Sequence, residues 1–159
     1  MNIIRMNILE IYTQIALFAQ ILPLIQPGTV LDGEIVMHGK YCRTIFIVFD
    51  VICCGKEPIL HLNFSDRLKC LRQASFRTKT ANRDMFASAS DLKNKDIPLP
   101  LVRKTFVQMM DLDDLLSHVV EERGARSYVN GDFHNHLTDG IIFQPNRPYK
   151  IGTDVHLLK

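Results

Sequence analysis

The residues of this chain whose types and spacing could support chemistry are, first, carboxylates placed beside glycine. Asp32, Gly33 and Glu34 form an Asp-Gly-Glu string, and Asp139 directly precedes Gly140. Taken singly, an Asp-Gly string is more typical of a turn than of a functional site. The order of several such strings along the chain is therefore more informative than any one of them.

A second candidate is the string His134, Asn135 and His136. Alternate residues of a strand point to the same face, so two histidines spaced in this way can share a metal ion. The sequence places no further cluster of metal ligands beside them. We therefore do not expect a metal-dependent or nuclease role for this string.

Four short motifs follow one another along the chain: LDGEIV at residues 31–36, IVFDVI at residues 47–52, DGIIFQP at residues 139–145 and LLK at residues 157–159. Four matches in order are hard to obtain by chance. Together they resemble the lysyl-nucleotidyltransferase superfamily, which includes messenger-RNA capping guanylyltransferases and ATP-dependent ligases.

The last of these regions, residues 136–159, looks most like cellular messenger-RNA capping enzymes. In those enzymes a DG-aliphatic-IF motif is followed by a tyrosine, a Gly-Thr turn and a Leu-Leu-Lys strand, and ligases usually carry glutamate at the position of Asp139. The resemblance covers residues 29–159 as a partial guanylyltransferase nucleotide-binding domain. Residues 1–28 show no such resemblance and are predicted to form an N-terminal helical segment.

The resemblance implies an activity and a set of partners. In this superfamily a lysine attacks the α-phosphate of the nucleotide, pyrophosphate leaves, and the lysine-bound GMP passes to the 5′ diphosphate end of RNA. It implies GTP as substrate, Mg²⁺ or Mn²⁺ as cofactor, the C-terminal tail of RNA polymerase II as a partner, and a nuclear location. No membrane partner is expected.

The resemblance also assigns roles to individual residues. Glu34 would contact the ribose hydroxyls, Gly33 would allow close approach of the backbone, and Phe49 would stack on guanine. Asp139 would bind the divalent metal, and Lys159 would supply a cation to the α-phosphate.

Three further charged residues have open interpretations. Asp50, directly after Phe49, could orient neighbouring groups by hydrogen bonding or serve a purely structural role. Arg67 and Arg72 could face RNA or a triphosphate, although charged residues on a helix usually form its solvated face.

The family pattern is not complete in this chain. The covalent lysine should lie in a K-x-D-G motif before LDGE, but the first lysine is Lys40, which follows that motif. A second lysine and an OB-fold domain are expected beyond Lys159. We therefore interpret the domain as incomplete at both ends and expect no activity from it alone. The alternatives are a catalytically inactive nucleotide- or RNA-binding module and a fragment of an ATP-dependent ligase.

The implied fold is an α+β nucleotidyltransferase, or adenylation-type, domain with antiparallel sheets around a nucleotide cleft. The sequence pattern predicts a helix at residues 8–22, strands at residues 29–36, 44–54, 140–144 and 155–158, a helix capped by Ser65, and a helix at residues 111–122. A turn is predicted at Asn130 and Gly131. Residues 44–54 have the composition of a strand buried on both faces. The polar stretch at residues 75–95 is predicted to be a surface loop.

The composition is that of an ordinary globular domain, with 47% hydrophobic and 23% charged residues in 159. A net charge of +2 is too small to indicate binding of the whole surface to nucleic acid or membranes, so any phosphate-binding surface must be local. The apolar stretch at residues 15–25 is too short to span a bilayer. The four cysteines are predicted to be reduced core thiols.

Overall fold

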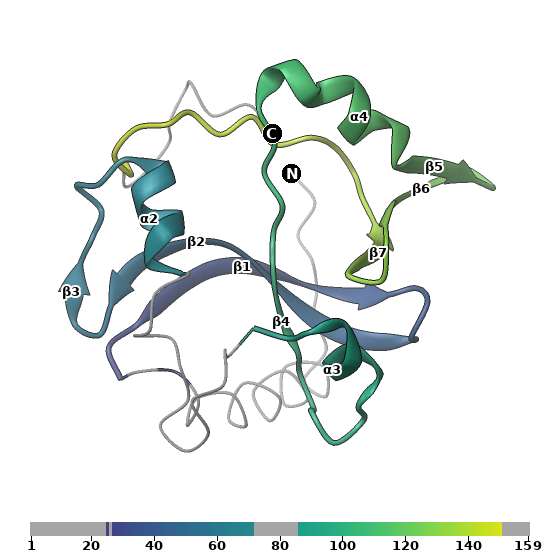
Figure 1. Ribbon diagram of the computed structural model, residues 1–159, viewed down its shortest axis with the longest axis horizontal. Coiled ribbons are helices and arrows are strands. Elements are labelled where there is room, and N and C mark those ends of the chain that lie inside the picture. The colour runs from purple at the N-terminus through teal and green to yellow at the C-terminus, as the bar shows by residue number, and fades with distance from the viewer. Residues whose placement is uncertain (1–24, 26, 72–85, 151–159) are drawn as a thin grey trace, which may run out of the picture.

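The computed structural model describes residues 25, 27–71 and 86–150. Its elements form two sheets joined by short helices (Figure 1). The predicted helix at residues 8–22, the predicted strand at residues 155–158, and the site candidates Arg72 and Lys159 lie outside the described residues.

A long antiparallel hairpin is the centre of the fold. Strands β1 (Val30–His38) and β2 (Arg43–Cys54) pair along their whole lengths, which confirms the two strands predicted from the sequence. The register shifts between Val30 and Leu31 and again between Asp32 and Gly33. The second irregularity lies within the Asp-Gly-Glu string, and bulges of this kind change the direction in which neighbouring side chains point.

Strand β2 is buried on both faces, as its composition predicted. Ile45 and Ile47 belong to one apolar cluster, while Phe46 and Val48 belong to the other. The same strand pairs with β3 (Glu57–Pro58) in antiparallel fashion and with β4 (Leu101–Arg103) in parallel fashion. The first sheet is therefore mixed, and its antiparallel part agrees with the implied fold.

Helix α2 (Phe64–Cys70) packs against β2, but two expectations about it were wrong. Its N-cap is Asn63, and Ser65 lies inside the first turn. Arg67 does not belong to a solvated face, because its side chain is fully buried and forms an ion pair with Asp50. An opposite charge inside the core is what allows this arginine to be buried.

The polar stretch predicted as a loop contains a short helix in its described part, α3 (Ala89–Lys93). Ser88 accepts a hydrogen bond from the backbone of Asp91, and the Asp91 carboxylate accepts one from the backbone of Ser88. This reciprocal capping box satisfies the free N–H groups of the first turn and stabilises a helix that has little apolar periodicity.

The second sheet has the order β5–β6–β7, with strands at Val119–Glu122, Ala125–Asn130 and His134–Leu137. It follows the 3₁₀ turn η3 (Met109–Asp111) and helix α4 (Leu112–Ser117). The helix predicted to reach residue 122 ends at Ser117, because the following residues pair with β6 around a tight turn at Gly124. The predicted turn at Asn130 and Gly131 is confirmed.

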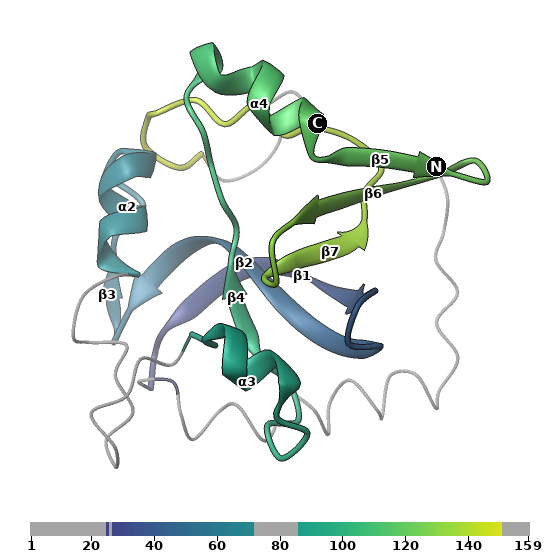
Figure 2. The ribbon, with the colours of Figure 1, turned by 45° about the vertical axis from the view of Figure 1, so that its right-hand side comes forward.

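Strand β7 joins the second sheet to the first. The backbone N–H of Gly39 donates to the carbonyl oxygen of Asn135 at 2.6 Å, and β7 contacts β1. Figure 2 shows β7 beside the far end of the β1–β2 hairpin, opposite the end that carries α2. Residues close to one another at this junction therefore come from both sheets.

The strand predicted at residues 140–144 is wrong, since residues 138–150 form no regular strand. Pro145 and Pro148 lack the N–H that a ladder requires. The segment is held instead through Asn146, Arg147 and Tyr149, which contact α2 and the loop before it. Of the cysteines, Cys42 is exposed rather than part of the core, and Cys53, Cys54 and Cys70 are partly buried.

Candidate functional site

Gly33 lies close against the backbone of β2. A Cβ at this position would overlap the carbonyl oxygen of Ile47 and would lie 2.9 Å from Cζ of Phe46. The strand can follow this path only because glycine has no side chain. The structure thus gives Gly33 a role within the sheet, and its contact with a nucleotide stays a prediction.

Lys104 is the residue around which the predicted site residues gather. Its backbone N–H donates to the carbonyl oxygen of Val48 at 2.8 Å, which extends the pairing of β4 with β2 by one residue. Its ammonium nitrogen lies 3.9 Å from a carboxylate oxygen of Glu34 and 5.3 Å from the centroid of the Phe49 ring. Lys104 lies in none of the motifs recognised from the sequence.

The charge of Lys104 is affected by its surroundings. Burial lowers the pKa of its ammonium group, while Glu34 and Asp139 act in the opposite direction. Asp139 is exposed and follows β7, where Thr138 donates to the Arg126 carbonyl oxygen. The structure therefore brings Glu34 and Phe49, from two separate motifs, next to one largely buried cation, and Asp139 of a third motif acts on the charge of that cation.

A pocket borders the same region. Phe49 and Asp50 of β2 line it together with residues from α2, from the segment after β4 and from the segment after β7. The full lining is Asp32, Phe49, Asp50, Phe64, Phe106, Ile142, Gln144, Pro145, Arg147, Pro148, Tyr149 and Lys150. Phe49 thus belongs both to this pocket and to the surroundings of Lys104, and Ile142 of the DGIIF motif shares the pocket with it.

Comparison with known families decides how this arrangement is classified. The sequence model described as the mRNA capping enzyme, catalytic domain, matches residues 2–159. The chain belongs to the mRNA capping enzyme catalytic domain family. No curated protein sequence matches the chain.

The sequence of this capping enzyme domain predicts a divalent ion at Asp139. Mg²⁺ keeps several water ligands and is commonly held by one or two carboxylates together with substrate phosphates. Asp139, exposed and near Lys104, fits such a role. Within residues 25, 27–71 and 86–150, no three His, Cys, Asp or Glu side chains gather as a complete protein-made metal site.

The histidines of the HNH string lie in the junction between the two sheets of the capping domain. His134 and His136 are buried with His38 of β1. Nε2 of His134 lies 3.0 Å from the hydroxyl of Thr105, and Nε2 of His38 donates to the carbonyl oxygen of Asp132 at 3.1 Å. Burial lowers the pKa of all three imidazoles, and that of His134 falls to about 4. These histidines are therefore neutral at pH 7.

One result concerns membranes. Among the described elements of the capping domain, no helix has the length and apolar character needed to cross a bilayer.

Proposed function

We propose that this chain carries the nucleotide-binding part of an mRNA guanylyltransferase, which transfers GMP from GTP to the 5′ diphosphate end of RNA through a lysyl-GMP intermediate. The observation that carries the proposal is the contact of Lys104 with both Glu34 and Phe49 in a member of the capping enzyme family, with Asp139 acting on the charge of the same lysine. These three residues come from different motifs and from both sheets or the segments that follow them.

Each residue has a chemistry suited to one part of GTP. The half-exposed carboxylate of Glu34 can accept hydrogen bonds from the ribose hydroxyls. The Phe49 ring can stack on the base, with Ile142 in the same pocket. Asp139 would hold Mg²⁺ or Mn²⁺, and the ion would offset charge on the phosphates. Lys159 remains the proposed cation for the α-phosphate.

Lys104 supports guanine over adenine. Its ammonium group can donate hydrogen bonds but cannot accept them, and it lies over the face of the ring proposed to stack on the base. Guanine presents a carbonyl oxygen at position 6, whereas adenine presents an amino group that also donates. A base that stacks on this face of Phe49 would displace the ammonium group from above the ring, and the displaced group would meet an acceptor in GTP and a second donor in ATP.

The proposal concerns binding more than the covalent step. No lysine precedes Glu34 in these 159 residues, so the K-x-D-G nucleophile is not among them. A nuclear location, a 5′ diphosphate RNA acceptor and contact with the RNA polymerase II tail belong to the same proposal, and family membership is their support.

A labelling experiment with α-³²P-GTP and Mg²⁺ or Mn²⁺ tests this proposal, with retention of the nucleotide read on a native filter and on a denaturing gel. We expect saturable retention on the filter, weakened in Glu34→Gln, with no label on the denatured chain. Absence of retention by the wild-type chain contradicts the proposal. A covalent label that Lys104→Met removes would instead make Lys104 a nucleophile and overturn the assignment of Lys104 to the base.

The second candidate is a catalytically inactive nucleotide- or RNA-binding module, which the same gathering of side chains also favours. These two candidate functions can be distinguished by mixing the chain with a segment of another family member that carries the K-x-D-G lysine. Adduct formation in the mixture supports a guanylyltransferase part, and GTP binding without any adduct supports the inactive module. An ATP-dependent ligase fragment predicts preference for ATP in the same assay.

A further inference from the structure

Asp50 is a motif residue that the proposed function leaves unused. It directly follows Phe49 on β2, and only 4% of its surface is exposed. Its carboxylate accepts a hydrogen bond from the backbone N–H of Val51 at 2.8 Å and two more bonds from the guanidinium group of Arg67. A carboxylate held at this depth must be fully paired, because an unpaired buried charge is strongly destabilising.

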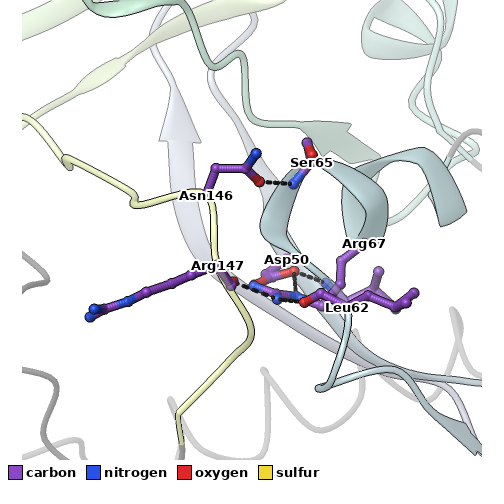
Figure 3. A network of polar contacts seen from close by, with 7 residues as sticks. Asp50, Leu62, Ser65, Arg67, Asn146 and Arg147 are labelled. Carbon is purple, nitrogen blue, oxygen red and sulfur yellow. Dashed lines mark hydrogen bonds and ion pairs between the residues drawn. The ribbon is translucent and has the colours of Figure 1, made fainter.

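Arg67 extends this buried ion pair into a network of hydrogen bonds with the backbone of two other segments. Its Nε and one terminal nitrogen bind the two oxygens of Asp50 at 2.9 and 2.6 Å. Its other terminal nitrogen donates to the carbonyl oxygens of Leu62 at 2.7 Å and Arg147 at 3.2 Å. Figure 3 shows the Arg67 side chain between Asp50 and these two backbone oxygens. One side chain thus links β2, the loop before α2 and the segment after β7.

The segment at residues 145–149 is bound at two more points, one on α2 and one on the loop before it. The Asn146 side-chain oxygen accepts a hydrogen bond from the backbone N–H of Ser65 at 2.9 Å (Figure 3). The backbone N–H of Tyr149 donates to the carbonyl oxygen of Leu60 at 2.9 Å, and the Arg67 guanidinium lies 5.6 Å from the centroid of the Tyr149 ring. Without a regular strand, these contacts are what fix the segment.

The segment so held forms one side of the pocket that contains Phe49. Phe49 and Asp50 line it from β2, while Ile142, Gln144, Arg147 and Tyr149 line it from the segment after β7. The distance between these two sides depends on the bonds through Arg67, because Arg67 is bound to both.

We propose that Asp50 and Arg67 are positioning residues for the nucleotide base: their buried ion pair holds residues 145–149 on β2 and α2 and so fixes the pocket between Phe49 and Ile142. This inference rests on the proposed function. Lysine cannot replace Arg67, because one ammonium group cannot bind two carboxylate oxygens side by side and two carbonyl oxygens in a fixed plane. The pair acts on the base and leaves the phosphates of GTP to other groups.

The test compares Arg67→Lys with Lys69→Gln in the full chain. Lys69 lies on the same helix and forms only an exposed ion pair, with Asp66 at 2.6 Å, so its loss serves as the matched control. Binding of GTP and of inorganic tripolyphosphate is measured by calorimetry, and exchange of the Tyr149 amide proton is followed by hydrogen–deuterium exchange. Tripolyphosphate separates a positioning role from a general loss of folded protein, which would weaken both ligands equally.

For Arg67→Lys we expect a loss of GTP affinity of roughly tenfold, because small displacements of a binding wall have large effects. Tripolyphosphate affinity stays unchanged, and the Tyr149 amide exchanges faster than in Lys69→Gln. If Arg67→Lys does not fold, Asn146→Ala releases the same segment from the surface and is expected to show the same pattern to a smaller degree. A folded variant with unchanged GTP affinity and unchanged Tyr149 exchange overturns the inference. Absence of GTP binding by the wild type contradicts the proposed function instead, and Tyr149 exchange then still decides whether the pair holds the segment.

Discussion

The ammonium nitrogen of Lys104 lies 5.3 Å from the centroid of the Phe49 ring, although the two residues belong to distant parts of the sequence. The parallel pairing of β4 with β2 produces this contact, because the Lys104 backbone continues the ladder beside Val48. It places a cation next to the aromatic ring proposed for base stacking. The account of nucleotide binding depends on this contact more than on any single motif.

Replacing Phe49 with leucine is expected to weaken GTP binding. Stacking of a base on an aromatic ring contributes about 1–3 kcal/mol, which corresponds to a loss of affinity between roughly fivefold and 150-fold. Calorimetric titration with GTP measures the change, and tripolyphosphate should bind as before. Phe133→Leu, in the exposed β6–β7 turn, is the control. Equal losses for both variants, or for both ligands, would show that Phe49 acts through the core alone.

Replacing Glu34 with glutamine is expected to reduce discrimination between GTP and its 2′,3′-dideoxy analogue. A hydrogen bond to a charged acceptor contributes roughly 1.5–3 kcal/mol and one to a neutral acceptor roughly 0.5–1.5 kcal/mol, so the wild type should prefer GTP by tenfold or more and the variant by less. The comparison of two ligands in each protein cancels the effect of freeing Lys104 from its ion pair. Glu57→Gln, exposed on β3, should keep the wild-type ratio. A Glu34 variant that keeps it too removes this residue from the ribose contact.

Replacing Gly33 with alanine is expected to destabilise the fold. The added methyl group would overlap the Ile47 carbonyl oxygen, and overpacking of this kind costs about 1–3 kcal/mol. Chemical denaturation followed by circular dichroism gives the free energy of unfolding. Gly140→Ala is the matched control, since a Cβ there meets no atom within 4 Å. Equal stability of the two variants would mean that the hairpin tolerates a wider separation at Gly33.

Acidification is expected to destabilise the junction between the sheets. Folding holds the pKa of His134 at about 4, below its ordinary value of 6.5, through burial and through the nearby His136, Lys104 and His38. The unfolded chain then binds more protons between these values, so stability is full above pH 6.5 and falls as the pH drops toward 4. This difference in the pKa of His134 between the folded and unfolded chain corresponds to roughly 3 kcal/mol in the free energy of unfolding.

Free energies of unfolding measured from pH 7 to pH 4 check this dependence. In His134→Gln the slope should be shallower, whereas His61→Gln, at an exposed histidine, should leave it unchanged. Identical slopes in the wild type and His134→Gln would show that other groups, such as carboxylates, govern the acid response.

Local sequence patterns were sufficient for the two long strands and the Asn130–Gly131 turn. The run of β-branched and aromatic residues in β2 required a strand with both faces covered, and the alternation of its residues between two apolar clusters follows directly. The helix predicted through residue 122 failed because pairing with β6, a contact between different segments, outweighed local helix preference. The strand predicted at residues 140–144 did not form, and the residues that follow it are held to α2 by bonds of Asn146 and Arg147 in place of a ladder.

Two important charged residues were missed or misread for the same reason. Apart from its place directly after an apolar run, nothing near Lys104 in the sequence distinguishes it from a surface lysine, since its neighbours Glu34 and Phe49 reach it only through sheet pairing. Arg67 resembles a residue of a solvated helix face, and only the fold places Asp50 beneath it. The apolar strand β4, which ends at Arg103 and is followed by Lys104, was the available signal for Lys104, because charges at the end of a buried strand require partners.

The most direct test of the central claim is the ratio of GTP to ATP affinity in the wild-type chain and in Lys104→Gln, measured by calorimetry with Mg²⁺. The wild type is expected to prefer GTP by roughly tenfold or more, since one correctly placed hydrogen bond discriminates between bases by about 1–3 kcal/mol. Lys104→Gln is expected to lose most of this preference while still binding both nucleotides. Equal affinities in the wild type, or a preference that survives in the variant, would contradict the placement of the guanine base beside Phe49 and Lys104.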